Sequence, residues 1–328
     1  MTPTATTSAC TRARPTPTPR PGTRAAPCGS GREVIHNPFK RRVLEPHGWQ
    51  PRRVDPRGVY SLQQLLAAGV SRAQLKQELS VGRLRRIGRG WFAEPFADSE
   101  VVRAITLGGR LGCLSGSRAH GLWVPPDSHL HVVVNPGVAV PRSQSGVQFH
   151  RLDSFCADAL ASMDQCLGQV IQRHSPEEAL VVLESAVNLE LVAPADARAL
   201  INAAPVRKRR ALEHFQLGAQ SGSETRLRLF FQQRRVKVKP QAFIPGVGRV
   251  DMLVGRSWIV EADSHAHHSA GFNIEVDRDR DLNAWELGYE RTRFTYQQIW
   301  WSWERTQQAL LAGLASKRHL RPPKPRAA

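Results

Sequence analysis

The most constraining feature of the chain is a series of short apolar, β-branched segments near the C-terminus that contain or end in acidic residues. One reads Gly-Arg-Val-Asp-Met-Leu-Val and contains Asp251, and the next, Trp-Ile-Val-Glu-Ala-Asp, contains Glu261 and Asp263. Such runs, separated by Gly-Arg-Ser, predict two strands joined by a tight turn. The alternation of side chains along a strand places Glu261 and Asp263 on the same face. A folded sheet would therefore hold several carboxylates close together.

Crowded carboxylates have a characteristic chemistry. They repel one another, and each is costly to ionise alone. A divalent cation with oxygen ligands relieves this repulsion and catalyses phosphodiester hydrolysis. We therefore expect Asp251 and Glu261 to bind Mg²⁺ or Mn²⁺. The nearby His-Ala-His-His run is an alternative transition-metal site, but it lacks the spacing of a structural zinc motif.

The charge of the chain indicates a partner. Its formal net charge is +18, and its positive residues occur in clusters, which is typical of proteins that bind a phosphate backbone. We expect the partner to be DNA; the alternative is the general arginine richness of proteins from GC-rich genomes. The clusters are Arg83, Arg85, Arg86 and Arg89; residues 207–210; and Arg234, Arg235, Lys237 and Lys239.

Composition also argues against several classes of protein. No apolar run approaches the ~20 residues needed to span a bilayer, and no signal-peptide core is present, so we expect a cytoplasmic protein with no membrane partner. The five cysteines are odd in number and contain no Cys-x-x-Cys pair. This argues against a disulfide framework and against a structural zinc site. His120 and His129 have no partners at ligand spacing, and we expect them to be satisfied polar groups.

The pattern along the chain predicts an α+β or α/β multidomain protein. Ser61 and Ser71 cap two short helices closed by Gly69 and Gly82, and a basic hairpin follows, which is the order of a winged helix-turn-helix. The alternative is a small helical bundle with a basic edge. Ser175-Pro-Glu-Glu begins a longer helix. The expected divisions are a disordered basic tail (1–45), a winged helix-turn-helix (57–95), a small mixed domain (96–155), a helical connector (156–215), an endonuclease-like domain (218–312) and a disordered basic tail (313–328).

Residues 59–150 resemble the N-terminal part of AbiEi-type abortive-infection antitoxins. Those proteins pair a winged helix with a small mixed domain that carries a Ser-x-x-Ala-x-x-Gly-Leu segment. Ser117, Ala119, Gly121 and Leu122 fall near that pattern, with Ser117 and Ala119 one residue closer than usual. The resemblance implies DNA binding through the second helix and the hairpin arginines Arg83, Arg85, Arg86 and Arg89, and a cognate toxin as a further partner.

Residues 220–303 resemble the PD-(D/E)xK nucleases, and more narrowly the very-short-patch-repair-like endonucleases. The expected order is α-β-β-β-α-β, the core of a restriction-endonuclease-like fold, and a repair protein becomes a further candidate partner. Glu lies on the first helix, Val-Asp precedes a hairpin, Glu-x-Asp ends the next strand, and Asp-x-x-Arg-Asp and Gly-Tyr with a late Arg follow. The resemblance implies a catalytic set of Glu224, Asp251, Glu261, Asp263, His268 and Arg280, with Asp277, Asp281 and His265 in support.

Two departures from that family change the expected roles. Asp263 stands where the superfamily usually has Lys, so phosphate stabilisation falls to His268, with His265 and His267 as alternatives, and to Arg280. Ser264 stands where the family usually has Gly. We therefore expect a metal-dependent DNA endonuclease. The alternatives are an antitoxin-type DNA-binding regulator whose nuclease-like domain does not cleave and, for Asp277, Asp279 and Asp281, an ordinary charged helix face.

Overall fold

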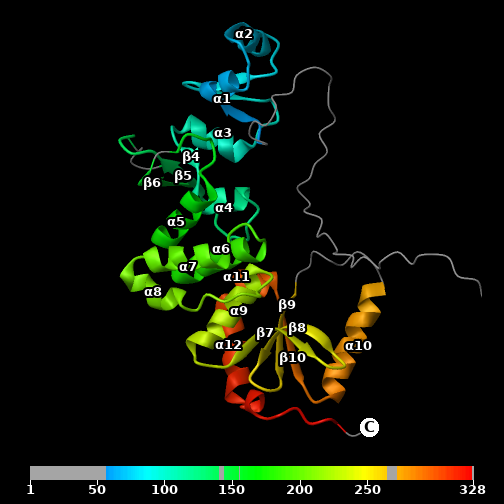
Figure 1. Ribbon diagram of the computed structural model, residues 1–328. Helices are drawn as coiled ribbons and strands as arrows, with labels where there is room; N and C mark the ends of the chain where they lie inside the picture. Colours follow the sequence, from blue (N-terminus) through cyan, green and yellow to red (C-terminus); the bar gives the residue numbers. More distant parts are fainter. Residues whose placement is uncertain (1–56, 140–143, 155, 264–271, 327–328) are drawn as a thin grey trace, which may run out of the picture. The chain divides into compact units, whose positions relative to one another are not determined.

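The computed structural model describes residues 57–139, 144–154, 156–263 and 272–326. Within these ranges the protein is a mixed α and β structure with twelve α-helices and three small sheets (Figure 1). The tail expected at residues 1–45 lies outside the described residues. No helix in the described ranges is both long and apolar enough to cross a membrane.

The first described segment consists of two capped helices and a small antiparallel sheet with strand order β1-β3-β2. Ser61 and Ser71 each accept a hydrogen bond from the backbone of a glutamine three residues later, whose side chain bonds back to complete a capping box. Both expected helices and the basic hairpin are therefore confirmed as elements. The elements are β1 (Val59–Ser61), α1 (Leu62–Ala67), α2 (Arg72–Ser80), β2 (Arg85–Gly88) and β3 (Trp91–Ala93).

A second sheet has the order β4-β5-β6, with β5 antiparallel to β4 and parallel to β6. Strand β5 is buried along its whole length, and His131 is the one polar residue in its otherwise apolar sequence. The elements are α3 (Ser99–Thr106), β4 (Arg110–Leu111), α4 (Cys113–Ala119), β5 (Leu130–Val134) and β6 (Val147–Arg151).

Four helices follow. Ser175 caps the longest of them in a capping box with Glu178, and Pro176 occupies its first turn. A buried ion pair joins this helix to α9, because Arg228 Nη2 lies 2.5 Å from Glu184 Oε1. The helices are α5 (Met163–Arg173), α6 (Pro176–Asn188), α7 (Pro194–Ala203) and α8 (Val206–Leu212).

The C-terminal elements follow the expected α-β-β-β-α-β order. Their sheet has the order β10-β9-β8-β7, with β10 parallel to β9 and the other pairs antiparallel. Residues 238–244 form a single strand. The elements are α9 (Gly222–Gln233), β7 (Val238–Ile244), β8 (Gly248–Val254), β9 (Trp258–Asp263), α10 (Phe272–Glu286), β10 (Glu290–Thr295), α11 (Tyr296–Trp300) and α12 (Trp303–Ala315).

Two apolar clusters hold helices against this sheet. Phe231 of α9 and Leu310 of α12 pack with Met252 and Val260 of the sheet. Ala284 of α10 belongs to a separate cluster built on β7, β8 and Ile259. Successive side chains of a strand point to opposite faces of the sheet. Met252 and Val260, which contact α9 and α12, therefore occupy even-numbered positions, whereas the acidic residues Asp251, Glu261 and Asp263 occupy odd-numbered ones.

The basic C-terminal segment differs from the expected disordered tail at 313–328. Helix α12 continues to Ala315, and a short 3₁₀ turn (Arg318–Leu320) follows. His319 is buried, and its backbone oxygen accepts a hydrogen bond of 2.7 Å from Arg256 N. Arg326 lies over the Trp285 ring. Backbone pairing and stacking of cationic side chains on aromatic rings, which charge composition does not reveal, hold this segment in place.

Candidate functional site

Asp251 lies in the middle of β8, which keeps the same register with β7 on both sides of this residue. Its neighbours pair as Ala242 with Val250 and Pro240 with Met252, which places Gln241 opposite Asp251. Asp251 Oδ2 accepts a hydrogen bond of 2.8 Å from Ala262 N on β9. Its carboxylate is therefore fixed between β8 and β9 by a main-chain donor.

Glu224 occupies the first turn of α9 and is buried. Its Oε2 accepts hydrogen bonds from Gln220 N at 3.0 Å and from Gln241 Nε2 at 2.8 Å. Ser221, the residue that caps α9, contacts Oε1 at 3.1 Å. Gln241 thus connects the start of α9 to the strand position opposite Asp251. Sequence reasoning missed Gln241, whose backbone has a φ of 47°, a value rare for a residue with a side chain.

Burial and like charge act together on these carboxyl groups. Burial, together with the charges of Glu224 and Glu261, raises the pKa of Asp251 to about 7, although the Ala262 N–H and Arg280 oppose the change. Burial also raises the pKa of Glu224, although its hydrogen bonds oppose the change. Asp251 therefore interacts with two neighbouring carboxylates, and full ionisation of the set at neutral pH is unfavourable without an added positive charge.

Glu261, by contrast, already has cationic partners. Its Oε2 lies 2.5 Å from Arg291 Nη2 and 3.3 Å from Arg293 Nε, and its Oε1 lies 3.9 Å from Arg280 Nη2. Arg291 and Arg293 also pair with Asp281 of α10. A network of two carboxylates and several guanidinium groups therefore joins β9, β10 and α10.

Arg280 has a positioning role as well as a charge. Its Nε donates to Val247 O at 3.0 Å and its Nη2 to Arg249 O at 2.5 Å, so it fastens α10 to the β7–β8 hairpin. Asp277 lies 3.6 Å from Arg280 Nη1. Asp279 is exposed on the same helix, in keeping with a surface residue.

The expected catalytic set is brought together in part. Glu224, Asp251 and Glu261 interact electrostatically, and Asp263 ends β9 opposite Thr295 of β10. Within the described ranges, however, these acidic residues do not form a group of three or more converging ligands. His265, His267 and His268 lie outside the described residues.

The basic clusters differ in their surroundings. Arg83, Arg85, Arg86 and Arg89 are all exposed on or beside β2, and Arg83 pairs with Glu78 at 2.9 Å. Lys208, in the second cluster, instead donates to the carbonyl oxygens that end α5, among them Ile171 O at 2.9 Å and His174 O at 2.5 Å. Lys208 therefore caps a helix, so the second cluster is in part structural.

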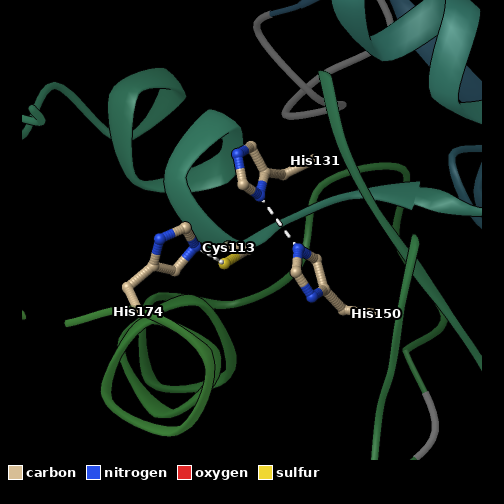
Figure 2. A group of neighbouring side chains, drawn as sticks. All are labelled: Cys113, His131, His150 and His174. Atoms are coloured by element: carbon tan, nitrogen blue, oxygen red, sulfur yellow. Dashed lines mark hydrogen bonds between the residues drawn. The ribbon is translucent and has the colours of Figure 1, made fainter. Parts of the chain in front are cut away.

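A second constellation was missed by sequence reasoning. Cys113, His131, His150 and His174 point toward one another (Figure 2), with one potential ligand atom from each and all four atoms within 4.8 Å of one another. His131 Nδ1 lies 2.9 Å from His150 Nε2, and Cys113 Sγ lies 3.2 Å from His174 Nε2. The four come from separate elements, so no short motif could reveal them.

Burial governs the ionisation of this group. It lowers the pKa of His131 and of His150 to about 4, and it raises the pKa of the Cys113 thiol to about 12. Both imidazoles are therefore neutral at pH 7, with a lone pair on each ring. His120 and His129 lie elsewhere, at 2.8 Å from Ala161 O and 3.1 Å from Asp127 Oδ1, which confirms them as satisfied polar groups.

Comparisons with known proteins give no relative from which a role could be transferred. No protein-family model matches the chain, and no curated protein matches it significantly. The functional argument therefore depends on the geometry of the two groups of side chains.

Proposed function

We propose that this protein hydrolyses phosphodiester bonds of DNA with a divalent cation, Mg²⁺ or Mn²⁺, held at Asp251. The observation that carries the proposal is a half-buried Asp251 whose pKa is raised to about 7 beside Glu224 and Glu261. A cluster of carboxylates is suited to a divalent cation, whose charge relieves their mutual repulsion.

The donor set fits a hard cation. Asp251 offers Oδ1, because Oδ2 already accepts from Ala262 N. Glu261 offers Oε1, because Oε2 is bound by Arg291. Glu224, at the start of α9, already accepts hydrogen bonds from Gln220 N and Gln241 Nε2, so we assign it a water-mediated contact with the cation. A cation bound here would polarise the scissile phosphate and lower the pKa of a bound water.

Asp263 stands where PD-(D/E)xK nucleases usually have a lysine, so the positive charge near the phosphate would come from arginines instead. Arg280 and Arg293 lie beside Glu261 at 3.9 and 3.3 Å, so the carboxylate on which the cation depends is bordered by guanidinium groups. A guanidinium can donate two parallel hydrogen bonds to a phosphate. Arg280 is also fixed by two main-chain oxygens, which favours it for positioning the substrate.

The N-terminal elements suit a DNA contact. We infer that α1, α2 and the β2–β3 hairpin form a winged helix-turn-helix, with α2 in the major groove and the hairpin on phosphates. The exposed side chains of Arg85, Arg86 and Arg89 support this interpretation. Arg86 lies over the Phe92 ring of the neighbouring strand, at 5.6 Å, which directs it along the hairpin.

The test is cleavage of supercoiled plasmid by the purified full-length chain with Mg²⁺ or Mn²⁺. Wild type should nick the plasmid, and Asp251→Asn and Glu261→Gln should not. The matched control is Asp279→Asn, which removes the same charge from an exposed position and should cut as wild type does. Wild type that leaves DNA intact with either metal, or an Asp251→Asn variant of undiminished activity, contradicts the proposal.

One observation favours a second candidate, an antitoxin-type DNA-binding regulator without cleavage. Glu261 is already neutralised by Arg291 at 2.5 Å, as in a site that has no need of a metal. This candidate predicts a preferred DNA sequence in a footprinting experiment, with protection unchanged by Asp251→Asn and by chelators. Metal-dependent nicking lost in Asp251→Asn would rule it out.

A further inference from the structure

We propose that Cys113, His131, His150 and His174 bind one zinc ion in a closed, structural site. This inference is independent of the carboxylate site and of cleavage. Its starting point is convergence: the four ligand atoms lie within 4.8 Å of one another (Figure 2). One thiolate and three imidazole nitrogens form a ligand set that suits zinc.

The distances leave a site of the right size. In a tetrahedral zinc site with Zn–N bonds of about 2.0–2.1 Å, two ligand nitrogens lie about 3.3–3.4 Å apart. His131 Nδ1 and His150 Nε2 are 2.9 Å apart, so a displacement of only a few tenths of an ångström would admit the ion. Cys113 Sγ and His174 Nε2, at 3.2 Å, need a movement of similar size.

The outer ring nitrogens of His131 and His174 have the environment that zinc-bound histidines require. His131 Nε2 is buried and has no hydrogen-bond partner in the described part of the chain, but Asp127 Oδ1 lies 3.5 Å away. His174 Nδ1 faces Glu178 Oε1 at 3.8 Å. A carboxylate behind a ligating imidazole fixes its tautomer and increases its basicity. With His131 Nε2 protonated toward Asp127, its Nδ1 lone pair is directed at the centre of the group.

The backbone holds the ligands in place. Cys113 begins α4 with a φ of 50°, an uncommon conformation for a residue with a side chain and one found at functional sites. Gly112 precedes it, and a Cβ there would lie 2.5 Å from Val133 Cγ1, so close packing against β5 requires glycine. Ser115 Oγ accepts from His131 N at 3.0 Å, which fastens α4 to β5.

The zinc site would be structural because the protein supplies the ligands for all four coordination positions of the ion. Cys113 and His131 are fully buried, His150 is buried and His174 is mostly buried, which leaves no coordination position for a substrate. Zinc would connect the start of α4, strands β5 and β6 and the end of α5. The Cys113 thiol would lose its proton to solvent, and Asp127 and Glu178 would balance the remaining positive charge.

The competing explanation is a metal-free cluster joined by a thiol–imidazole and an imidazole–imidazole hydrogen bond. Metal content distinguishes the two. Full-length protein purified without chelators, measured by inductively coupled plasma mass spectrometry, should contain one zinc per chain. Cys113→Ser should lose most of it. Cys156→Ser is the matched control, because Cys156 is also buried but its Sγ contacts the carbonyl oxygens of Asp158 and Leu160.

Cobalt substitution adds a spectroscopic readout that can be taken on wild type itself. Wild type loaded with Co²⁺ should show the intense visible bands of tetrahedral cobalt and a thiolate-to-cobalt charge-transfer band in the near ultraviolet. The charge-transfer band should persist in Cys156→Ser and disappear in Cys113→Ser. Wild type that is free of zinc and binds neither Zn²⁺ nor Co²⁺ overturns the proposal, as does another metal in place of zinc or a charge-transfer band that survives Cys113→Ser.

Discussion

The raised pKa of Asp251 makes the stability of the metal-free protein depend on pH in a way that one substitution should remove. The pKa is about 7 in the folded protein against an ordinary value of 3.8. The folded state therefore binds this proton more tightly than the unfolded state. Its contribution to stability is fully present below pH ~4 and is lost as the pH rises through ~7.

The magnitude follows from that difference. Each pKa unit corresponds to about 1.4 kcal/mol, which gives an upper value of about 4 kcal/mol, and partial solvent access to the carboxylate reduces it to about 2 kcal/mol. Asp251→Asn keeps an oxygen that can accept from Ala262 N but has no charge to bury. The variant should therefore gain about 1 kcal/mol over wild type between pH 5 and pH 8 in the presence of a chelator, because about three-fifths of the effect falls within this pH range.

The assay is urea unfolding of wild type and Asp251→Asn at both pH values. For each protein the change in the free energy of unfolding between the two pH values is measured, and the change for wild type is subtracted from that for the variant. The subtraction matters because His131 and His150, whose pKa values are lowered to about 4, act in the opposite direction below pH 6.5 in both proteins. Asp279→Asn should behave as wild type. An equal change with pH in wild type and Asp251→Asn would refute the reasoning, since Asp251 would then ionise freely.

Three further predictions concern other parts of the structure. Mn²⁺ affinity, measured by calorimetry, should fall about tenfold per pH unit below pH 7, because Asp251 must lose its proton to bind the ion; a pH-independent affinity would place the ion elsewhere. Arg228→Ala should lower the free energy of unfolding by about 3–5 kcal/mol, since it leaves Glu184 charged and buried, and adding Glu184→Leu should recover part of the loss in urea titrations. Replacing Arg85 and Arg86 with Ala should reduce the slope of log affinity for DNA against log salt by about 2, whereas the exposed Arg305→Ala should leave it unchanged.

The elements of the fold follow from local signals. Ser61, Ser71 and Ser175 cap the helices they were expected to begin, because each has a glutamine or glutamate three residues later. The acidic strands were readable because apolar runs bounded by turns specify β8 and β9 almost to the residue. Both kinds of signal lie within a few residues of the element they define.

The site residues that the sequence did not predict are brought together by tertiary contacts. Arg291 was not singled out, although it binds Glu261 more closely than Arg293 or Arg280 does, because the parallel pairing of β10 with β9 sets that contact. The group of Cys113, His131, His150 and His174 was not predicted for the same reason, because its members lie on separate elements. The sequence argued against a structural zinc site because it contains no closely spaced pair of cysteines. A site whose ligands come from four separate elements needs no such pair.

The central claim is that Asp251 and Glu261 bind a divalent cation, and anomalous X-ray scattering tests it most directly. Crystals of the full-length protein grown with Mn²⁺ should give an anomalous peak within coordination distance of Asp251 Oδ1 and Glu261 Oε1, with Arg291 still bound to Glu261 Oε2. A map with no peak beside Asp251 would contradict the account.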